Sequence, residues 1–303
     1  MPIDSDPDPP DRARETPAAP QTPVSRGPRD GPEAAAFRQQ QVAEHLRYHR
    51  VADAAYEAAA RQTWAQAVPD LRAAWEEHRE KFPERTRPTP HSQPDGGWVA
   101  DGDRRLTPEQ NAEADKACAD LRDEADQVTL PAMRRVEAAS PGGRLAGLDH
   151  MLKGEDRLKE KIADYLRAPG VTVRGALDKV PDAVRYTLTY DDARGYADGV
   201  LADIDGLKAE GFELIKLKNL WHAEQYKGIN SQWRRPDTGL RFEMQFHTPE
   251  SHEAKELTHQ AYERIRSKTA PPAEEGELEE FQRRVNAHLA TPPGTDRVKD
   301  FPE

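Results

Sequence analysis

The sequence predicts an α/β (α+β) fold in which helices flank a mixed β-sheet, with a helical region in front of it. Three short runs, residues 183–190, 212–217 and 240–247, alternate apolar and polar side chains, as strands with one buried face do. A further strand is predicted at 229–234, and segments with helical spacing of apolar residues surround these runs. The order strand, helix, strand, strand, strand, helix indicates a mixed sheet covered by helices.

Composition and chain breakers divide the sequence into six regions. Residues 1–32 hold nine of the 26 prolines and few large apolar side chains, which predicts a disordered leader. Residues 33–82 are rich in Ala, Gln, Glu and Arg with spaced apolar residues, which predicts one or two helices. The other regions are a linker at 83–106, a helical segment at 107–140 that packs on the core, a compact domain at 141–268, and a C-terminal helix and tail at 269–303. Pro131 is expected to break or kink the helical segment.

The first helix of the compact domain carries a ridge of cations. Apolar residues over 152–166 recur at helical spacing, and Lys153, Arg157 and Lys161 recur every four residues on a separate face. Acidic residues lie between them, so the ridge is either a clamp for phosphates or an ordinary solvated helix face.

The remaining elements follow in order. A helix is predicted over 196–210, where the next residue is a glycine that can end it. The strands at 229–234 and 240–247 are expected to pair through the turn between them. Another helix is predicted over 251–266, with a proline just before it and Ser251 as its N-cap.

Charge and composition exclude several classes of function. Between Ser140 and Lys268 there are 21 Lys plus Arg and 21 Asp plus Glu, so the net charge of −11 lies in the flanks and no broad nucleic-acid surface is expected. The single cysteine, Cys118, excludes an intramolecular disulfide and a cysteine metal cage. No membrane span and no Sec signal peptide are predicted. The expected location is the cytoplasm, or outside the cell after export by a system that needs no such signal.

The strand at 240–247 is the most informative segment for chemistry. Four polar residues share one of its faces: Arg241, Glu243, Gln245 and His247. This face is either merely solvated or part of a site. Asp182, at the start of the strand at 183–190, is expected to bring a second carboxylate near Glu243. Such a pair suits Mg²⁺, which takes one or two carboxylates and leaves other positions to water and phosphate oxygens.

A second group of candidate residues lies around the strand at 212–217. Lys216 and Lys218 add cations able to engage phosphates, and Tyr226 adds a ring that can stack on a base. Gly228 indicates a place where the backbone closely approaches another group. Ordinary core or turn packing explains these residues equally well.

These segments resemble the synthetase domain of the RelA/SpoT family, the pyrophosphokinases that make (p)ppGpp and related alarmones. The strongest part is Phe-Glu-Met-Gln-Phe-His-Thr at 242–248, which is similar to the family's E-[IV]-Q-[IV]-R-T strand. His259 and Tyr262 stand in the place of its H-x-x-Y helix. Three other segments resemble family motifs: 182–185 its D-x-x-G-x-R-type strand, 226–230 its Y-[RK]-[SG]-[IV]-H motif, and 152–161 its ATP-binding R-x-K-x-x-x-S-x-x-x-K segment.

The resemblance implies a nucleotidyltransferase-like RelA/SpoT synthetase fold for residues 141–268, which would be the catalytic domain. It implies Mg²⁺-dependent transfer of pyrophosphate from ATP to the 3′-hydroxyl of a purine nucleotide, with ATP and the acceptor as partners. Asp182 and Glu243 would be the metal ligands and, with Arg185, the catalytic residues. The candidate nucleotide-binding residues are Lys153, Arg157, Lys161, Lys216, Lys218, Tyr226, Asn230, Gln245 and His247.

Four residues depart from the family pattern: Met151 and His247 replace arginines, Arg157 replaces a serine, and Asn230 replaces a histidine. Met151 and Arg157 favour an alternative, a catalytically inactive RelA/SpoT-like interaction or effector protein. A third possibility is a hydrolase that uses the same two carboxylates.

The sequence contains no His-Asp dipeptide, so the resemblance does not extend to the family's hydrolase domain. The pattern is similar to that of stand-alone actinobacterial nucleotide 3′-pyrophosphokinases and of toxin domains in this superfamily. The N-terminal region is expected to bind a protein partner or a delivery system.

Overall fold

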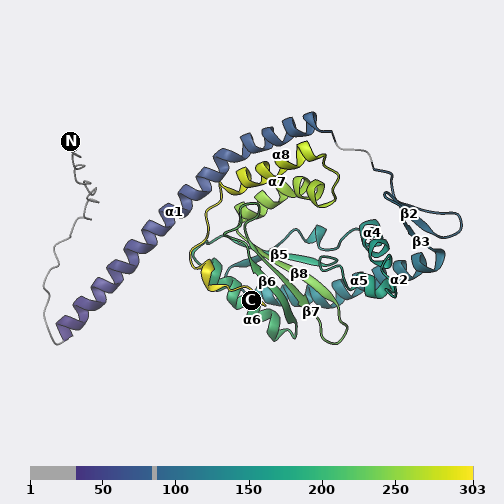
Figure 1. Ribbon diagram of the computed structural model, residues 1–303. Coiled ribbons are helices and arrows are strands. Elements are labelled where there is room, and N and C mark those ends of the chain that lie inside the picture. The colour runs from purple at the N-terminus through teal and green to yellow at the C-terminus, as the bar shows by residue number, and fades with distance from the viewer. Residues whose placement is uncertain (1–31, 84–86, 303) are drawn as a thin grey trace, which may run out of the picture. The chain divides into compact units, whose positions relative to one another are not determined.

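The computed structural model describes residues 32–83 and 87–302 (Figure 1). The chain divides into two compact units, Met1–Ala52 and Asp53–Glu303. Most of the predicted leader at 1–32 lies outside the described residues. In the first unit the described residues belong to the long helix α1 (Pro32–Lys81), which covers the region where the sequence predicts one or two helices.

The second unit has an additional small sheet where the sequence predicts a linker. Three short antiparallel strands, β1 (His91–Ser92), β2 (Trp98–Ala100) and β3 (Arg104–Leu106), pair in that order. Trp98 is buried, and its Nε1 donates a hydrogen bond to Oδ1 of Asp156 at 3.1 Å. The prolines and glycines of this region therefore form turns of a small ordered sheet, and the prediction of a plain linker missed it.

The helical segment before the main sheet is interrupted, as Pro131 predicts. Helix α2 (Pro108–Glu124) leads into a π-helical turn, η1 (Ala125–Thr129), and then into α3 (Leu130–Ala139). Pro131 lies at the start of α3, directly after η1, and without an N–H it cannot donate a hydrogen bond to the preceding turn. The π-turn is the place where the chain accommodates the break.

A mixed five-stranded sheet forms the centre of the unit, and it confirms the predicted fold class. The strand order is β4 (Gly143–Ala146), β5 (Arg185–Tyr190), β8 (Arg241–His247), β7 (Ile229–Arg234) and β6 (Glu213–Asn219). Strands β5 and β8 run parallel, and the other neighbours are antiparallel. The predicted pairing of β7 with β8 is confirmed, with Ile229 opposite Phe246. Strand β4 was not predicted.

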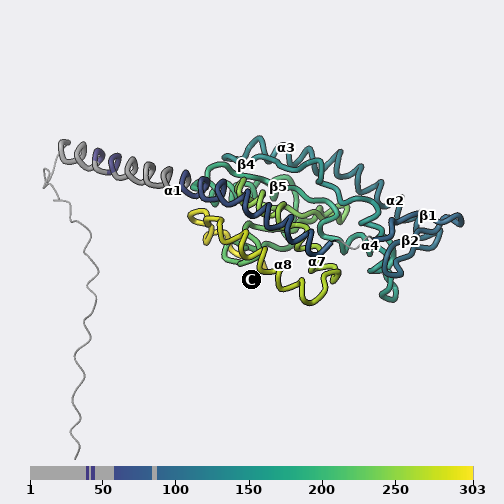
Figure 2. The backbone as a smooth tube through the Cα atoms, turned by 90° about the horizontal axis from the view of Figure 1, so that it is seen from above, coloured from purple at the N-terminus to yellow at the C-terminus, as the bar shows by residue number. Residues whose placement is uncertain are grey.

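Helices cover both faces of this sheet (Figures 1 and 2). The apolar face packs on α2, α3 and α6 (Tyr196–Ala209), and its largest buried side chains include Tyr186, Phe242 and Phe246. Helix α7 (Pro249–Arg266) packs on β5 and β8. The remaining helical elements are η2 (Leu148–His150), α4 (Glu155–Leu166), α5 (Val173–Leu177), α8 (Pro272–Asn286) and η3 (Thr295–Arg297).

Helix α7 begins two residues earlier than predicted. Its N-cap is Thr248, whose hydroxyl accepts a hydrogen bond from the N–H of Ser251 at 3.2 Å. The hydroxyl of Ser251 accepts in turn from the N–H of Thr248 at 3.0 Å. The prediction of Ser251 as the N-cap was therefore wrong. Thr248 is the N-cap, and Ser251 is the third helical residue, whose side chain completes the capping box.

A second apolar core joins the later part of α1 to α7 and α8. Trp64, Leu71 and Trp75 of α1 pack against Ala254 and Ala261 of α7 and against three residues of α8: Leu278, Phe281 and Val285. Figure 2 shows the three helices side by side. This part of α1 is an integral layer of the second unit. None of the helices in the described residues is long and apolar enough to cross a membrane.

Candidate active site

Three of the four polar residues on this face of β8 are buried, so the interpretation of a merely solvated strand face is wrong for them, whereas Arg241 at the start of the strand is exposed. The exposed fractions of Glu243, Gln245 and His247 are 8%, 4% and 0%. Register places residues of four strands in two rows across this face: Lys216, Gln232, Glu243 and Arg185 in one, and Lys218, Asn230, Gln245 and Thr187 in the other. Buried polar side chains in such rows must satisfy one another or bind something else.

The two predicted carboxylates come together at the beginning of β5. The N–H of Glu243 donates to the carbonyl of Val184 at 2.9 Å, which sets Glu243 beside the segment that starts at Asp182. Burial and the negative charge of Asp182 raise the pKa of Glu243, although Arg185 opposes the shift. The two groups thus repel each other across a poorly hydrated space.

The pKa of Asp182 shifts in the opposite direction to that of Glu243, because Lys153 lies next to Asp182. Residues 151–153 run antiparallel to 183–185, with the N–H of Lys153 donating to the carbonyl of Ala183 at 3.0 Å. This arrangement brings Nζ of Lys153 within 2.9 Å of Oδ2 of Asp182. Burial acts to raise the pKa of Asp182, but the attraction of Lys153 outweighs it and the pKa is lowered.

The other predicted phosphate-binding cations lie further from the carboxylates. Arg157 on α4 is exposed and pairs with Glu160 at 2.9 Å, and Lys161 is half-buried on the same helix. Lys216 is exposed on β6, two strands from Glu243, which corresponds to roughly 10 Å between backbones. Lys218 pairs with Asp300 of the C-terminal segment at 2.7 Å.

Tyr226, Gly228 and His247 form a tight group at the other end of β8. The hydroxyl of Tyr226 lies 2.9 Å from Nε2 of His247, and Nδ1 of His247 lies 2.9 Å from the hydroxyl of Ser251. Gly228 has a φ of 149°, and a Cβ there would lie only 2.7 Å from Cε1 of His247. The close approach predicted from Gly228 is therefore to the His247 ring.

Gln245 has an unsatisfied acceptor on this buried face. Its Nε2 donates to Oε1 of Glu243, and Asn230 also donates a side-chain hydrogen bond to Glu243. Within the described residues, Oε1 of Gln245 is buried and has no hydrogen-bond partner. A buried amide oxygen normally has a donor, so this atom is suited to accept one from a water or a bound molecule.

Helix α7 contributes a polar stripe that sequence reasoning missed. Five residues at spacings of three and four form it, and we call them the α7 stripe: His252, Lys255, His259, Tyr262 and Arg266. The His252 ring lies 5.8 Å from that of His247. Lys255 interacts electrostatically with Arg185 and Glu243, and Arg266 with Asp182. Only His259 and Tyr262 of the stripe were noted from the sequence, although the helical spacing of all five was visible there.

The donor set fits a hard divalent cation but not a ligand-rich metal centre. No group of three or more His, Cys, Asp or Glu residues suited to a metal occurs in the part of the chain that the structure describes. Two mutually repelling carboxylates, Asp182 and Glu243, remain as candidate ligands. This matches Mg²⁺, which needs few protein ligands when phosphates and water supply the others.

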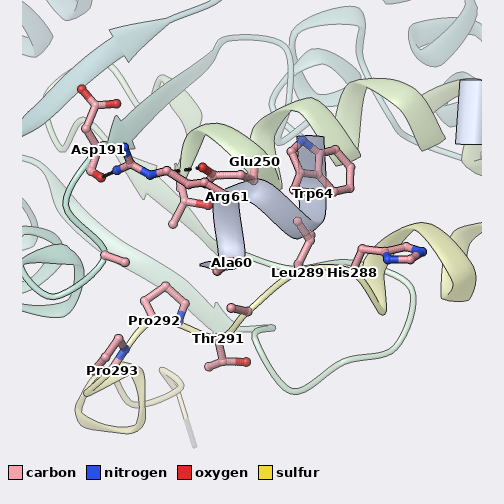
Figure 3. Close-up of a pocket in the computed structure, with 13 residues that line it drawn as sticks. Ala60, Arg61, Trp64, Asp191, Glu250, His288, Leu289, Thr291, Pro292 and Pro293 are labelled. Atoms are coloured by element: carbon pink, nitrogen blue, oxygen red, sulfur yellow. Dashed lines mark hydrogen bonds and ion pairs between the residues drawn. The ribbon is translucent and has the colours of Figure 1, made fainter. Parts of the chain in front are cut away.

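A cavity lies elsewhere, beyond the carboxyl ends of β5 and β8 (Figure 3). Residues of α1, the start of α7 and the segment 288–293 line it. Arg61 extends into this region, where its Nε lies 3.6 Å from Oε1 of Glu250. The chemistry-bearing residues gather instead on the polar face of the sheet, and we take that face as the candidate site.

Comparisons with known proteins give no match to a protein-family model or to a curated protein. Solved structures similar to the chain are a GTP pyrophosphokinase family protein and small alarmone synthetases. The former, from Streptococcus pneumoniae, has 17% identity and a TM-score of 0.37, with 60% of this chain and 90% of that chain covered. Small alarmone synthetase 1 from Bacillus subtilis, bound to its product pppGpp, has 14% identity and a TM-score of 0.43, with 62% of this chain and 96% of that chain covered. Small alarmone synthetase 2 from the same organism has 13% identity and a TM-score of 0.36, with 58% of this chain and 91% of that chain covered.

His247 is expected to make folding sensitive to acid. Burial lowers its pKa well below 6.5, assisted by Lys255, His252 and Arg185, so the folded state keeps the ring neutral. As the pH falls below 6.5, the unfolded chain binds a proton that the folded chain does not, and stability falls by up to about 1.4 kcal/mol per pH unit for this group.

Urea unfolding of wild type and His247→Gln between pH 7.5 and 5 tests this expectation. The wild type should lose stability more steeply than the variant over that interval. Parallel curves would show that His247 does not carry the acid sensitivity.

Proposed function

We propose that the chain transfers the β,γ-pyrophosphoryl group of ATP to the 3′-hydroxyl of a purine nucleotide. The 3′-oxygen forms a bond to the β-phosphorus, and the bond from that phosphorus to the oxygen bridging it to the α-phosphorus breaks. AMP leaves with the bridging oxygen, and the proton of the hydroxyl passes to a base. The products are AMP and a nucleotide 3′-diphosphate of the (p)ppGpp or (p)ppApp type.

One observation supports this proposal most strongly: the buried Glu243 and the part-buried Asp182 interact with each other and with several cations. Lys153 and Arg266 act on Asp182, and Arg185 and Lys255 act on Glu243. A buried carboxylate with a raised pKa is suited to accept the proton of the attacking hydroxyl. The cations are suited to hold phosphates against it.

The proposal gives each residue of the site a part. Asp182 and Glu243 would hold Mg²⁺, which when bound would neutralise charge on the phosphates. Lys153 and Arg185 would engage the ATP phosphates. Arg157, Lys161, Lys216 and Lys218 are further phosphate candidates, and Lys218 would first have to leave Asp300.

The other end of β8 is proposed to hold the acceptor nucleotide. Tyr226 would stack on its base, after turning from the edge-on contact with His247, and Asn230, Gln245 and His247 would orient it. The unsatisfied Oε1 of Gln245 is available to a donor on that nucleotide. Binding of a protein partner or a delivery system by the N-terminal region is also kept as a proposal.

Acceptor-dependent release of AMP tests the proposed reaction. Purified protein is incubated with Mg²⁺, labelled ATP and, separately, AMP, ADP, GDP or GTP. We expect AMP to form only when an acceptor is present, together with a pyrophosphorylated acceptor. AMP or ADP formed equally without an acceptor would indicate a hydrolase, and unchanged ATP with every acceptor would support the inactive alternative.

A further inference from the structure

We propose that Lys255, in the α7 stripe, binds a phosphate group of the nucleotide held against the polar face of the sheet. This inference rests on the proposed function and adds a residue from a helix that the motifs did not assign to phosphate binding. Helix α7 packs on β5 and β8, and the side chain of Lys255 is 11% exposed. Its ammonium group interacts electrostatically with Arg185 of β5 and Glu243 of β8.

Ion pairs of the protein compensate the charge of Lys255 only in part. Glu243 attracts Lys255 electrostatically but forms no ion pair with it in the described residues. Within the described residues its one ion-pair partner is Glu256, the next residue, with Nζ 3.0 Å from Oε1. The side chain of Glu256 is 52% exposed, and an exposed carboxylate compensates little for burying an ammonium group. Arg185, a second cation close to Lys255, has no ion pair in the described part of the chain. A phosphate between them would relieve the repulsion of these two cations.

The position of Lys255 along the stripe identifies the phosphates as its ligand. At one end of the stripe, His252 lies against His247, in the region proposed for the acceptor. At the other end, Arg266 interacts with Asp182, which Lys153 also contacts. Lys255 therefore lies between the proposed acceptor and the proposed ATP phosphates, where the transferred group must pass. A lysine suits this position because its compact charge adapts to a phosphate that moves.

Calorimetric titration of the full chain tests the inference with two probes in the presence of Mg²⁺. These are α,β-methylene-ATP, which cannot be cleaved at the reacting position, and inorganic tripolyphosphate, which lacks a nucleoside. We expect Lys255→Met to weaken both by about 10- to 100-fold, the effect of one lost hydrogen bond to a charged group. Lys255→Gln replaces Lys255→Met in the titration if the methionine variant does not fold. Either folded variant shows whether Lys255 binds phosphate.

Two matched variants separate phosphate binding from a structural role. Glu256→Gln removes the partner of Lys255 and should leave both affinities unchanged or slightly tighter, because a competing anion is lost. Lys208→Met removes an exposed lysine that pairs with Asp205 on α6, and it should have no effect on binding. Equal weakening in Lys255→Met and Glu256→Gln would show that Lys255 only pairs with Glu256, and would overturn the inference.

Transfer activity measured on the same preparations separates this inference from the proposed function. Wild-type transfer together with unchanged probe affinities in folded Lys255→Met would overturn the inference alone. Weakened tripolyphosphate binding in Lys255→Met, with a wild type that transfers nothing, would support the inference and overturn the proposed function.

Discussion

Glu243→Gln is expected to reduce pyrophosphate transfer by about 100- to 10,000-fold, the range for loss of a proton-accepting group. Glutamine keeps the shape of the side chain and its hydrogen bonds with neighbours, but it can neither accept the proton nor bind Mg²⁺ as a carboxylate does. The variant should unfold at the same temperature as wild type or a higher one. It removes a charge that is 8% exposed and is repelled by Asp182. AMP release and thermal unfolding measured side by side check both expectations.

Glu213→Gln is the matched control for this experiment. Glu213 is a strand glutamate of the same sheet, but it lies exposed on β6 in an ion pair with Arg234. Its loss should change neither transfer nor stability by much, since exposed pairs contribute about 0–1 kcal/mol. Substantial transfer by folded Glu243→Gln would show that Glu243 is neither the proton acceptor nor an essential Mg²⁺ ligand.

Trp75→Ala is expected to lower the free energy of unfolding by about 3–5 kcal/mol, as truncation of a buried large aromatic side chain does. Trp75 is buried on α1, stacked on His78 at 5.3 Å and on Phe281 of α8 at 5.1 Å between ring centroids. Because α7 lies between this second core and the polar face, transfer should fall with the loss of structure. Urea unfolding followed by tryptophan fluorescence gives the free energy.

Glu80→Ala gives the corresponding control on the same helix. Glu80 is exposed on α1, and replacing it should change stability by less than about 0.5 kcal/mol. A similarly small effect of Trp75→Ala would contradict the assignment of this part of α1 to the core of the second unit.

The length and regularity of each pattern decided which elements the sequence could predict. Strands β5, β7 and β8 have six or seven residues with one apolar face, and their pairing follows from the short turn between β7 and β8. Strand β4 has four residues, and β1–β3 have two or three, too few for alternation to be recognised. The second core depends on contacts between α1 and residues about 200 positions later, which no local pattern reveals.

Some features of the candidate site could likewise be predicted from local patterns, and others could not. Alternation of side chains placed Glu243, Gln245 and His247 on one face, and the start of β5 placed Asp182 beside Glu243. Local spacing does not show that this face is buried, since burial comes from α7 packing over it. The pairing of Lys218 with Asp300 joins residues 82 positions apart, so the sequence offered no signal for it.

The fate of the two terminal phosphorus atoms of ATP distinguishes pyrophosphate transfer from hydrolysis. ATP labelled at both the β- and γ-phosphorus is incubated with the full chain, Mg²⁺ and a mixture of purine nucleotides, and each labelled product is isolated. We expect both labels to enter one acceptor together as a 3′-diphosphate, with unlabelled AMP formed in equal amount. Label recovered only as free phosphate or pyrophosphate, or left entirely in ATP, would contradict it.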